Sequence, residues 1–174
     1  NWTVDTFGAN ITDHTFDTTT GKGVITFDGE VTKIGGAAFY ECSNITSVTM
    51  PESVTTLGIN AFSECTGMQE LILPHSITKI GGTYDAGAFR NCTGKLTINC
   101  NINDSYCDPS DDEYNIFYSA DFTEIIVGDS VTTIGKNAFR TCSELVSLTL
   151  GNNIQTFGSY ALYGCSKLTK IYGS

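Results

Sequence analysis

The sequence predicts an α/β solenoid, in which about six coils of roughly 23 residues stack around one shared interior. One observation behind this prediction is a segment written twice, as VTTLGINAFSECTGMQELIL at 54–73 and VTTIGKNAFRTCSELVSLTL at 131–150. Another is its period, because five copies of the pattern open at Val31, Val54, Ile77, Val131 and Ile154. A unit of this size cannot bury an apolar face alone, so neighbouring units must stack.

Residues 1–30 are expected to form an N-terminal cap, and residues 31–174 the solenoid. Within the cap, residues 11–27 alternate around a turn of the sequence TGKG, which predicts a β-hairpin. Ile25 and Phe27 also fit the strand positions of a half-coil that leads into Val31. The cap is therefore expected to cover one end of the stack.

Each coil ends in the pattern LxxLxL, whose period-two alternation predicts a half-buried strand. One strand per coil would pair into a parallel sheet with a spacing of about 4.8 Å. The glycine after each opening strand, such as Gly58, is expected to permit a positive φ or a close backbone approach at a corner. The segment from that glycine to the next cysteine is too short for a regular helix and predicts a helical or 3₁₀ turn.

The coils at 77–130 are irregular, with lengths of 25 and 29 residues. The first gains four residues, 83–86, and loses two between Cys92 and Leu96. The second gains seven residues in the segment 103–115, before Phe117 takes the aromatic position, and loses one before Phe122. Both insertions interrupt consecutive coils at the same place, between the opening strand and the aromatic. We therefore expect the two insertions to emerge side by side on one edge.

A cysteine recurs once in most coils, at Cys42, Cys65, Cys92, Cys142 and Cys165. Equivalent residues would lie near the coil spacing, whereas a disulfide needs Cβ atoms about 3.8 Å apart, and a straight row does not converge into a tetrahedral zinc site. These cysteines are therefore interpreted as buried packing residues with weak S–H donors. Cys100 and Cys107 lie outside the row, and a disulfide between them stays open as an alternative.

The repeats VTKIGGAAFYECSNITSVTMPES at 31–53 and VTTLGINAFSECTGMQELILPHS at 54–76 closely resemble the BspA-like leucine-rich repeats of bacterial surface proteins. The likeness covers 31–174, with a weaker copy at 102–130 in which Ala120 takes the cysteine position. It implies a right-handed leucine-rich-repeat solenoid, on a secreted or cell-surface protein whose leader and anchor lie outside this chain. It also implies protein binding or adhesion, toward a host protein or another cell-surface protein.

Composition argues against several other classes of function. A formal charge of −10 disfavours nucleic acid and anionic membranes as partners, and no apolar run is long enough to cross a bilayer. His14 and His75 stand at no catalytic spacing, and the ladder of Glu70, Lys95 and Glu124 is interpreted as stabilising rather than catalytic. We expect a non-enzymatic module without a cofactor or direct membrane insertion.

Two surfaces are candidate binding sites. On the outward row of the sheet, Ile72, Ile126 and Tyr172 exceed what solubility requires, although single apolar surface residues are ordinary. The insertions bring tyrosines and acids together, which suit a basic protein segment. These residues are Tyr84, Asp85, Tyr106 and Tyr114, with the acids Asp108, Asp111, Asp112 and Glu113. Those four acids are weak Ca²⁺ candidates because the EF-hand spacing is missing, and a solvated loop is the third interpretation.

Two other functions stay open as alternatives. The chain could be a structural spacer or stalk of a larger surface protein, or a carbohydrate-binding module. The last needs aromatic platforms on the sheet, and only Tyr172 qualifies. The final coil ends with apolar residues and no polar capping segment after them, so we expect further repeats or burial of this end against a partner. These residues are Phe157, Leu162, Leu168 and Ile171.

Overall fold

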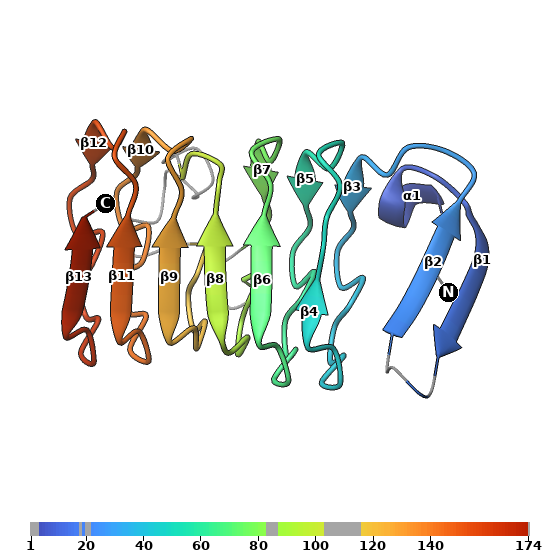
Figure 1. The fold of residues 1–174 in the computed structure, drawn as a ribbon, viewed down its shortest axis with the longest axis horizontal. Helices are drawn as coiled ribbons and strands as arrows, with labels where there is room; N and C mark the ends of the chain where they lie inside the picture. Colours follow the sequence, from blue (N-terminus) through green and yellow to red (C-terminus); the bar gives the residue numbers. More distant parts are fainter. Residues whose placement is uncertain (1–3, 18, 20–21, 83–86, 103–115, 174) are drawn as a thin grey trace.

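The computed structural model describes residues 4–173, except 18, 20–21, 83–86 and 103–115. Its coils follow one another along the long axis of the molecule, with the main strands side by side and a second row of short strands beyond them (Figure 1). In the described part, helix is confined to the four residues of α1 (Val4–Phe7). The predicted solenoid of stacked coils is confirmed.

The main sheet contains six parallel strands, one from each predicted coil, in the order β4–β6–β8–β9–β11–β13. Leu71 pairs with Leu96, and Ile125 pairs with Leu148, so the inward positions of successive coils lie over one another. The strands are β4 (Ser47–Val48), β6 (Glu70–Leu73), β8 (Lys95–Ile98), β9 (Glu124–Val127), β11 (Ser147–Leu150) and β13 (Lys170–Gly173).

The V-T-x-I opening of each coil forms the second, shorter row of strands. Strands β3, β5 and β7 pair in parallel, as do β10 and β12, and Ile102 bridges to Ile134 where the irregular coil intervenes. Their bounds are Lys33–Ile34, Thr56–Leu57, Lys79–Ile80, Thr133–Ile134 and Thr156–Phe157, in that order. The two rows enclose the core between them.

A ladder of phenylalanine rings runs through this core, with one ring from each of the first five coils. Successive ring centroids lie 5.2, 6.3, 5.4 and 5.5 Å apart, and the rings are stacked. Such pairs contribute about 0.5–1.5 kcal/mol each beyond the area they bury. The ladder consists of Phe39, Phe62, Phe89, Phe117 and Phe139. The aromatic position of the repeat therefore ties each coil to the next.

The segment between the glycine and the cysteine forms turns without a regular helix, and amides such as that of Tyr40 donate to the carbonyl oxygen three residues back, as in a single 3₁₀ turn. A longer 3₁₀ helix would use every amide within its own coil, but here alternate amides donate to carbonyl oxygens of the next coil. The N–H of Phe39 donates to Ala61 O at 2.8 Å, and the N–H of Glu41 to Ser63 O at 2.9 Å. Left-handed residues such as Asn60, with φ of 58°, allow this alternation.

The corner glycines allow the backbones of neighbouring coils to approach closely, which is one of the two roles expected of them. A Cβ on Gly58 would lie 2.4 Å from the backbone nitrogen of Gly36, a distance that no real Cβ tolerates. The Gly58 N–H also donates to Ile34 O at 2.7 Å. The positive φ falls two residues later, at Asn60. Glycine is required here because adjacent coils touch through their backbones.

The predicted hairpin is confirmed, with β1 (Ile11–Asp17) antiparallel to β2 (Lys22–Phe27). Because β2 pairs with β1 and not with the main sheet, Ile25 and Phe27 do not form the expected half-coil. Phe27 instead packs edge-on against Phe7, which in turn contacts Phe39 at 6.1 Å. The cap thus extends the phenylalanine ladder instead of the sheet.

The last coil leaves part of its apolar surface accessible. Phe157 and Ile171 are exposed, and Leu162 and Leu168 are half-buried against the core. The described part contains no helix that is long and apolar enough to cross a membrane.

Candidate functional site

The outer face of the main sheet carries one continuous row of side chains. The register pairs Ile72 with Thr97, Thr97 with Ile126, Ile126 with Thr149, and Thr149 with Tyr172. Alternation along each strand directs this row away from the core, because its neighbours Leu71 and Leu73 are buried. The three predicted binding residues of the sheet therefore lie on one face, on alternate strands.

The apolar members of this row are accessible to a partner to different extents. Ile72 is 38% exposed and Tyr172 is 51% exposed, whereas Ile126 is partly covered. At a strand spacing of about 4.8 Å, Ile72 and Ile126 lie roughly 10 Å apart, as do Ile126 and Tyr172. The row is long enough to contact an extended polypeptide, and we call it the sheet row.

A charged ladder borders the sheet row. Lys95 forms an ion pair with Glu70 at 3.7 Å, and Glu124 is its register partner on the other side. Both partners of the ion pair are solvent-exposed, so its contribution to stability is small. The charges therefore border the sheet row without fixing its position.

The insertion residues that we singled out all fall outside the described residues. They are Tyr84, Asp85, Tyr106, Asp108, Asp111, Asp112, Glu113 and Tyr114. The first described residues after the two insertions lie close together, because a Cβ on Gly87 would be 3.5 Å from the carbonyl oxygen of Ile116. Across the described ranges no cluster of three or more metal-ligating side chains is present. The insertion hypothesis stays a prediction.

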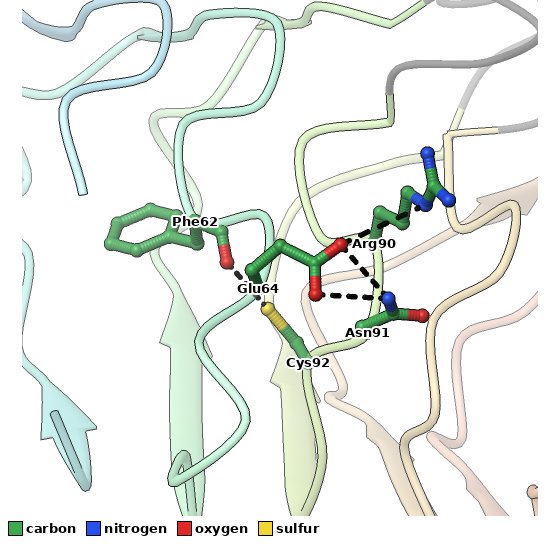
Figure 2. A network of polar contacts seen from close by, with 5 residues as sticks. All are labelled: Phe62, Glu64, Arg90, Asn91 and Cys92. Carbon is green, nitrogen blue, oxygen red and sulfur yellow. Dashed lines mark hydrogen bonds and ion pairs between the residues drawn. The ribbon is translucent and has the colours of Figure 1, made fainter. Parts of the chain in front are cut away.

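Polar contacts on the turn side link coils two and three, as Figure 2 shows. The Asn91 amide donates to both carboxylate oxygens of Glu64, at 2.9 and 3.0 Å, and Arg90 Nε lies 3.9 Å from Glu64 Oε1. Glu64 and Asn91 both have positive φ, which turns their side chains toward each other across the coil boundary. This network joins neighbouring coils next to the first insertion.

A second group on the turn side combines aromatic and basic side chains. The rings of Tyr160 and Tyr163 meet edge to face at 6.0 Å, and the guanidinium carbon of Arg140 lies 5.3 Å from the Tyr163 centroid. We call these three residues the tyrosine–arginine cluster. The sequence analysis did not predict this cluster, although the residue after the aromatic position is a tyrosine or an arginine in every coil but one. That position reads Tyr40, Ser63, Arg90, Tyr118, Arg140 and Tyr163.

The cysteine row consists of free thiols in the core, as predicted. Four of these thiols donate to the carbonyl oxygen of the aromatic residue in the preceding coil, namely Cys65, Cys92, Cys142 and Cys165. Cys92 Sγ, for example, lies 2.9 Å from Phe62 O (Figure 2), while Cys42 and Cys165 are only partly buried. Cys100 is also a free, buried thiol, while Cys107 lies outside the described residues. Burial raises the pKa of Cys100 to about 12 and also raises the pKa of Cys142. Thiols that stay protonated are poor nucleophiles.

The two histidines lie apart from these groups. His75 Nδ1 contacts Glu52 Oε2 at 2.9 Å on the surface, and His14 lies in β1 of the hairpin. Asp121 is half-buried, and burial together with Glu144 and Glu64 raises the pKa of its carboxyl group.

The chain is similar to a family of repeat proteins over nearly its whole length. The family model described as the BspA type leucine rich repeat region matches residues 8–108 and 113–174, in six copies. No curated protein is similar enough in sequence to count as a relative.

Three solved structures are similar to the chain at low sequence identity. A leucine-rich repeat protein of T. pallidum is 20% identical over 98% of this chain and 70% of its own, with a TM-score of 0.45. One from Bacteroides ovatus is 22% identical over 93% of this chain and 45% of its own, with a TM-score of 0.48. A leucine-rich cell surface protein of Faecalibacterium prausnitzii is 21% identical over 92% of this chain and 52% of its own, with a TM-score of 0.42. The chain spans about half the length of the last two.

Proposed function

The chain belongs to the BspA-type leucine-rich repeat family, and on this premise we propose that it is a non-enzymatic module that binds proteins outside the cell. The proposed setting is secretion or the cell surface, where such a module would serve adhesion to a host protein or to another cell-surface protein. The sheet row is proposed as the contact surface.

One observation carries this proposal, namely the apolar side chains of the sheet row. Packing does not require Ile72, since its side chain is exposed while its neighbours Leu71 and Leu73 fill the core, and Tyr172 is exposed as well. Threonine occupies the intervening strands at Thr97 and Thr149, so a polar β-branched residue fits the same backbone positions. Exposed isoleucine and tyrosine cost solubility there and supply contact area to a partner.

The test replaces the apolar members of the row by the residue type that the row already uses. A triple variant, Ile72→Thr with Ile126→Thr and Tyr172→Thr, should bind cultured epithelial cells at least about tenfold more weakly, which equals about 1.4 kcal/mol. Flow cytometry with the fluorescently labelled chain measures the binding. The matched control is Val24→Thr, an exposed apolar residue on β2 of the cap, which should bind as the native chain does.

Enzymatic treatment of the cells identifies the kind of partner. Trypsin should abolish binding of the native chain if the partner is a protein. Binding that survives trypsin and is lost after glycosidase treatment would contradict the proposal in favour of carbohydrate recognition. Equal binding by the native chain and the triple variant would remove the sheet row as the contact surface, and no binding by either chain would contradict the proposal in favour of a structural spacer.

A further inference from the structure

We propose that the tyrosine–arginine cluster (Arg140, Tyr160 and Tyr163) is a second contact surface that takes an acidic segment of a partner protein. This inference rests on the proposed protein-binding function and names a class of partner for it. The cluster lies on the turn side of the last two coils, at residues that belong to neither the sheet row nor the insertions.

The backbone at Tyr160 is the first reason to assign a role to the cluster. Tyr160 has φ of 57°, and the equivalent positions in three other coils carry Ala37, Asn60 and Asn137, also with positive φ. Asparagine adopts this left-handed conformation far more readily than an aromatic residue does. Tyr160 is also 62% exposed, so little burial offsets the strain. Strain without a packing benefit is typical of residues retained for function.

The geometry of the cluster is the second reason. Tyr163 is 59% exposed, and its ring lies nearly perpendicular to that of Tyr160, at an interplanar angle of 82°. The guanidinium group of Arg140 lies over the ring of Tyr163. The cation–π contact holds these two side chains together before any partner arrives. Tyrosine and arginine are the residue types that most often dominate the energy of protein interfaces. The cluster therefore offers a preorganised contact surface.

The charge of this part of the chain indicates the partner. Residues 131–174 carry four bases, Lys136, Arg140, Lys167 and Lys170, against one acid, Glu144, which is a net charge of +3. Residues 1–130 carry eighteen acids and five bases, a net charge of −13. Lys167 pairs with Glu144 at 2.6 Å, so the only acid of the basic stretch is already neutralised. Such asymmetry steers an acidic partner toward the last two coils.

The orientation of the rings favours a polypeptide over a sugar. A sugar ring stacks on a flat aromatic face, and a pair of tyrosines suited to it would lie side by side in one plane. Here the rings are nearly perpendicular, and Arg140 occupies a face of Tyr163. Side chains of a peptide can instead enter the angle between the rings while its carboxylates meet the surrounding positive charge.

Fluorescence anisotropy with a labelled 15-residue peptide of glutamate and leucine tests the proposal. The double variant Tyr160→Asn with Tyr163→Ser uses the residues that coil two carries at these positions, Asn60 and Ser63. We expect it to raise the Kd for the peptide at least tenfold. The control Tyr40→Ser removes an exposed tyrosine from the equivalent position of coil one and should stay within twofold of the native chain. A peptide with glutamine in place of glutamate should bind at least tenfold more weakly.

Folding is monitored by the thermal midpoint, which Tyr160→Asn should leave unchanged or raise because it relieves the left-handed strain. If the double variant loses its fold, Tyr160→Asn alone serves as the test and should raise the Kd at least threefold. A peptide that binds all folded variants equally, or that fails to bind the native chain, overturns the proposal. Heparin binding that depends on the tyrosines, without peptide binding, overturns it in favour of an anionic glycan.

The two proposals fail in different ways. One outcome is that the sheet-row variant loses cell binding while the peptide binds equally well with and without Tyr160 and Tyr163. That result would leave the proposed function intact and remove only this inference. Conversely, the chain could bind the peptide through Tyr160 and Tyr163 but bind no trypsin-sensitive partner on cells. That result would remove the proposed adhesive function and keep the acidic-peptide surface.

Discussion

At the residue scale, the corner glycines show how far this repeat depends on the absence of a side chain. The backbone of Gly58 packs directly on that of Gly35 and Gly36 in the coil before it, and Gly81 repeats the contact one coil later. Neighbouring coils can approach this closely only if the corner carries no Cβ. The glycine in the pattern is therefore a requirement of stacking and not of a special dihedral angle.

Gly58→Ala should lower the free energy of unfolding by about 1–3 kcal/mol, because the added methyl group forces backbone atoms apart. Urea unfolding followed by circular dichroism measures the change. Gly36→Ala is the matched control, since its Cβ would lie 3.4 Å from Ile59 O, an ordinary contact. Equal destabilisation by both substitutions would show that close approach is not the reason for the glycine.

The sequence predicts some single residues of the fold well and others not at all. The cysteine row could be predicted, because a straight ladder of equivalent positions cannot form disulfides or a tetrahedral site. The left-handed residues could be predicted only in part. Asn60 and Asn137 carry a signal, but Glu64 and Thr141 adopt positive φ because hydrogen bonds between coils impose it.

At the scale of elements, the strands follow from alternation, whereas the turns depend on neighbours. The leucine and isoleucine pattern places one face of β6, β8 and β9 in the core, so the strands and the sheet row could both be predicted. The bonding between turns escaped prediction because alternate amides donate across coils, which no property of one coil reveals. The tyrosine–arginine cluster escaped for the same reason, since Arg140 and Tyr163 belong to different coils.

The phenylalanine ladder supports a prediction about these elements. Phe89 is fully buried and contacts Phe62, Phe117 and Phe122, so Phe89→Ala should cost about 3–5 kcal/mol in unfolding free energy. Phe157→Ala, at the exposed equivalent of a core position in β12, should cost about 1 kcal/mol because much less area is lost from the interior. Denaturant unfolding of both variants checks the difference, and similar costs would contradict a continuous interior.

At the scale of the whole molecule, stability is a sum over contacts between adjacent coils. Strands β8 and β9 have a partner on each side, whereas β13 has a partner only in β11. The cap meets the first coil through Phe7 and through two backbone hydrogen bonds, from Thr32 N–H to Phe7 O and from Gly35 N–H to Thr6 O. Local opening should therefore differ along the axis.

Hydrogen exchange should follow this gradient. Amides of Leu96 and Ile125 should exchange most slowly, and amides of Ile171 and of the hairpin most quickly, because central strands open only when both neighbours separate. Exchange measured by mass spectrometry on peptic fragments resolves the coils. Equal protection along the whole chain would indicate one cooperative unit and contradict the additive picture.

The reduced thiols of the core have a consequence for how long such a module lasts. In air, dissolved oxygen and disulfides attack any thiolate they can reach, and four of the six free cysteines among the described residues are kept away from them by the closed stack. Each transient separation of two coils would offer a thiol to irreversible cross-linking. The working lifetime of the protein in air would then be set by the fraction of time that neighbouring coils stand open, and so by the local free energy of opening instead of the global free energy of unfolding.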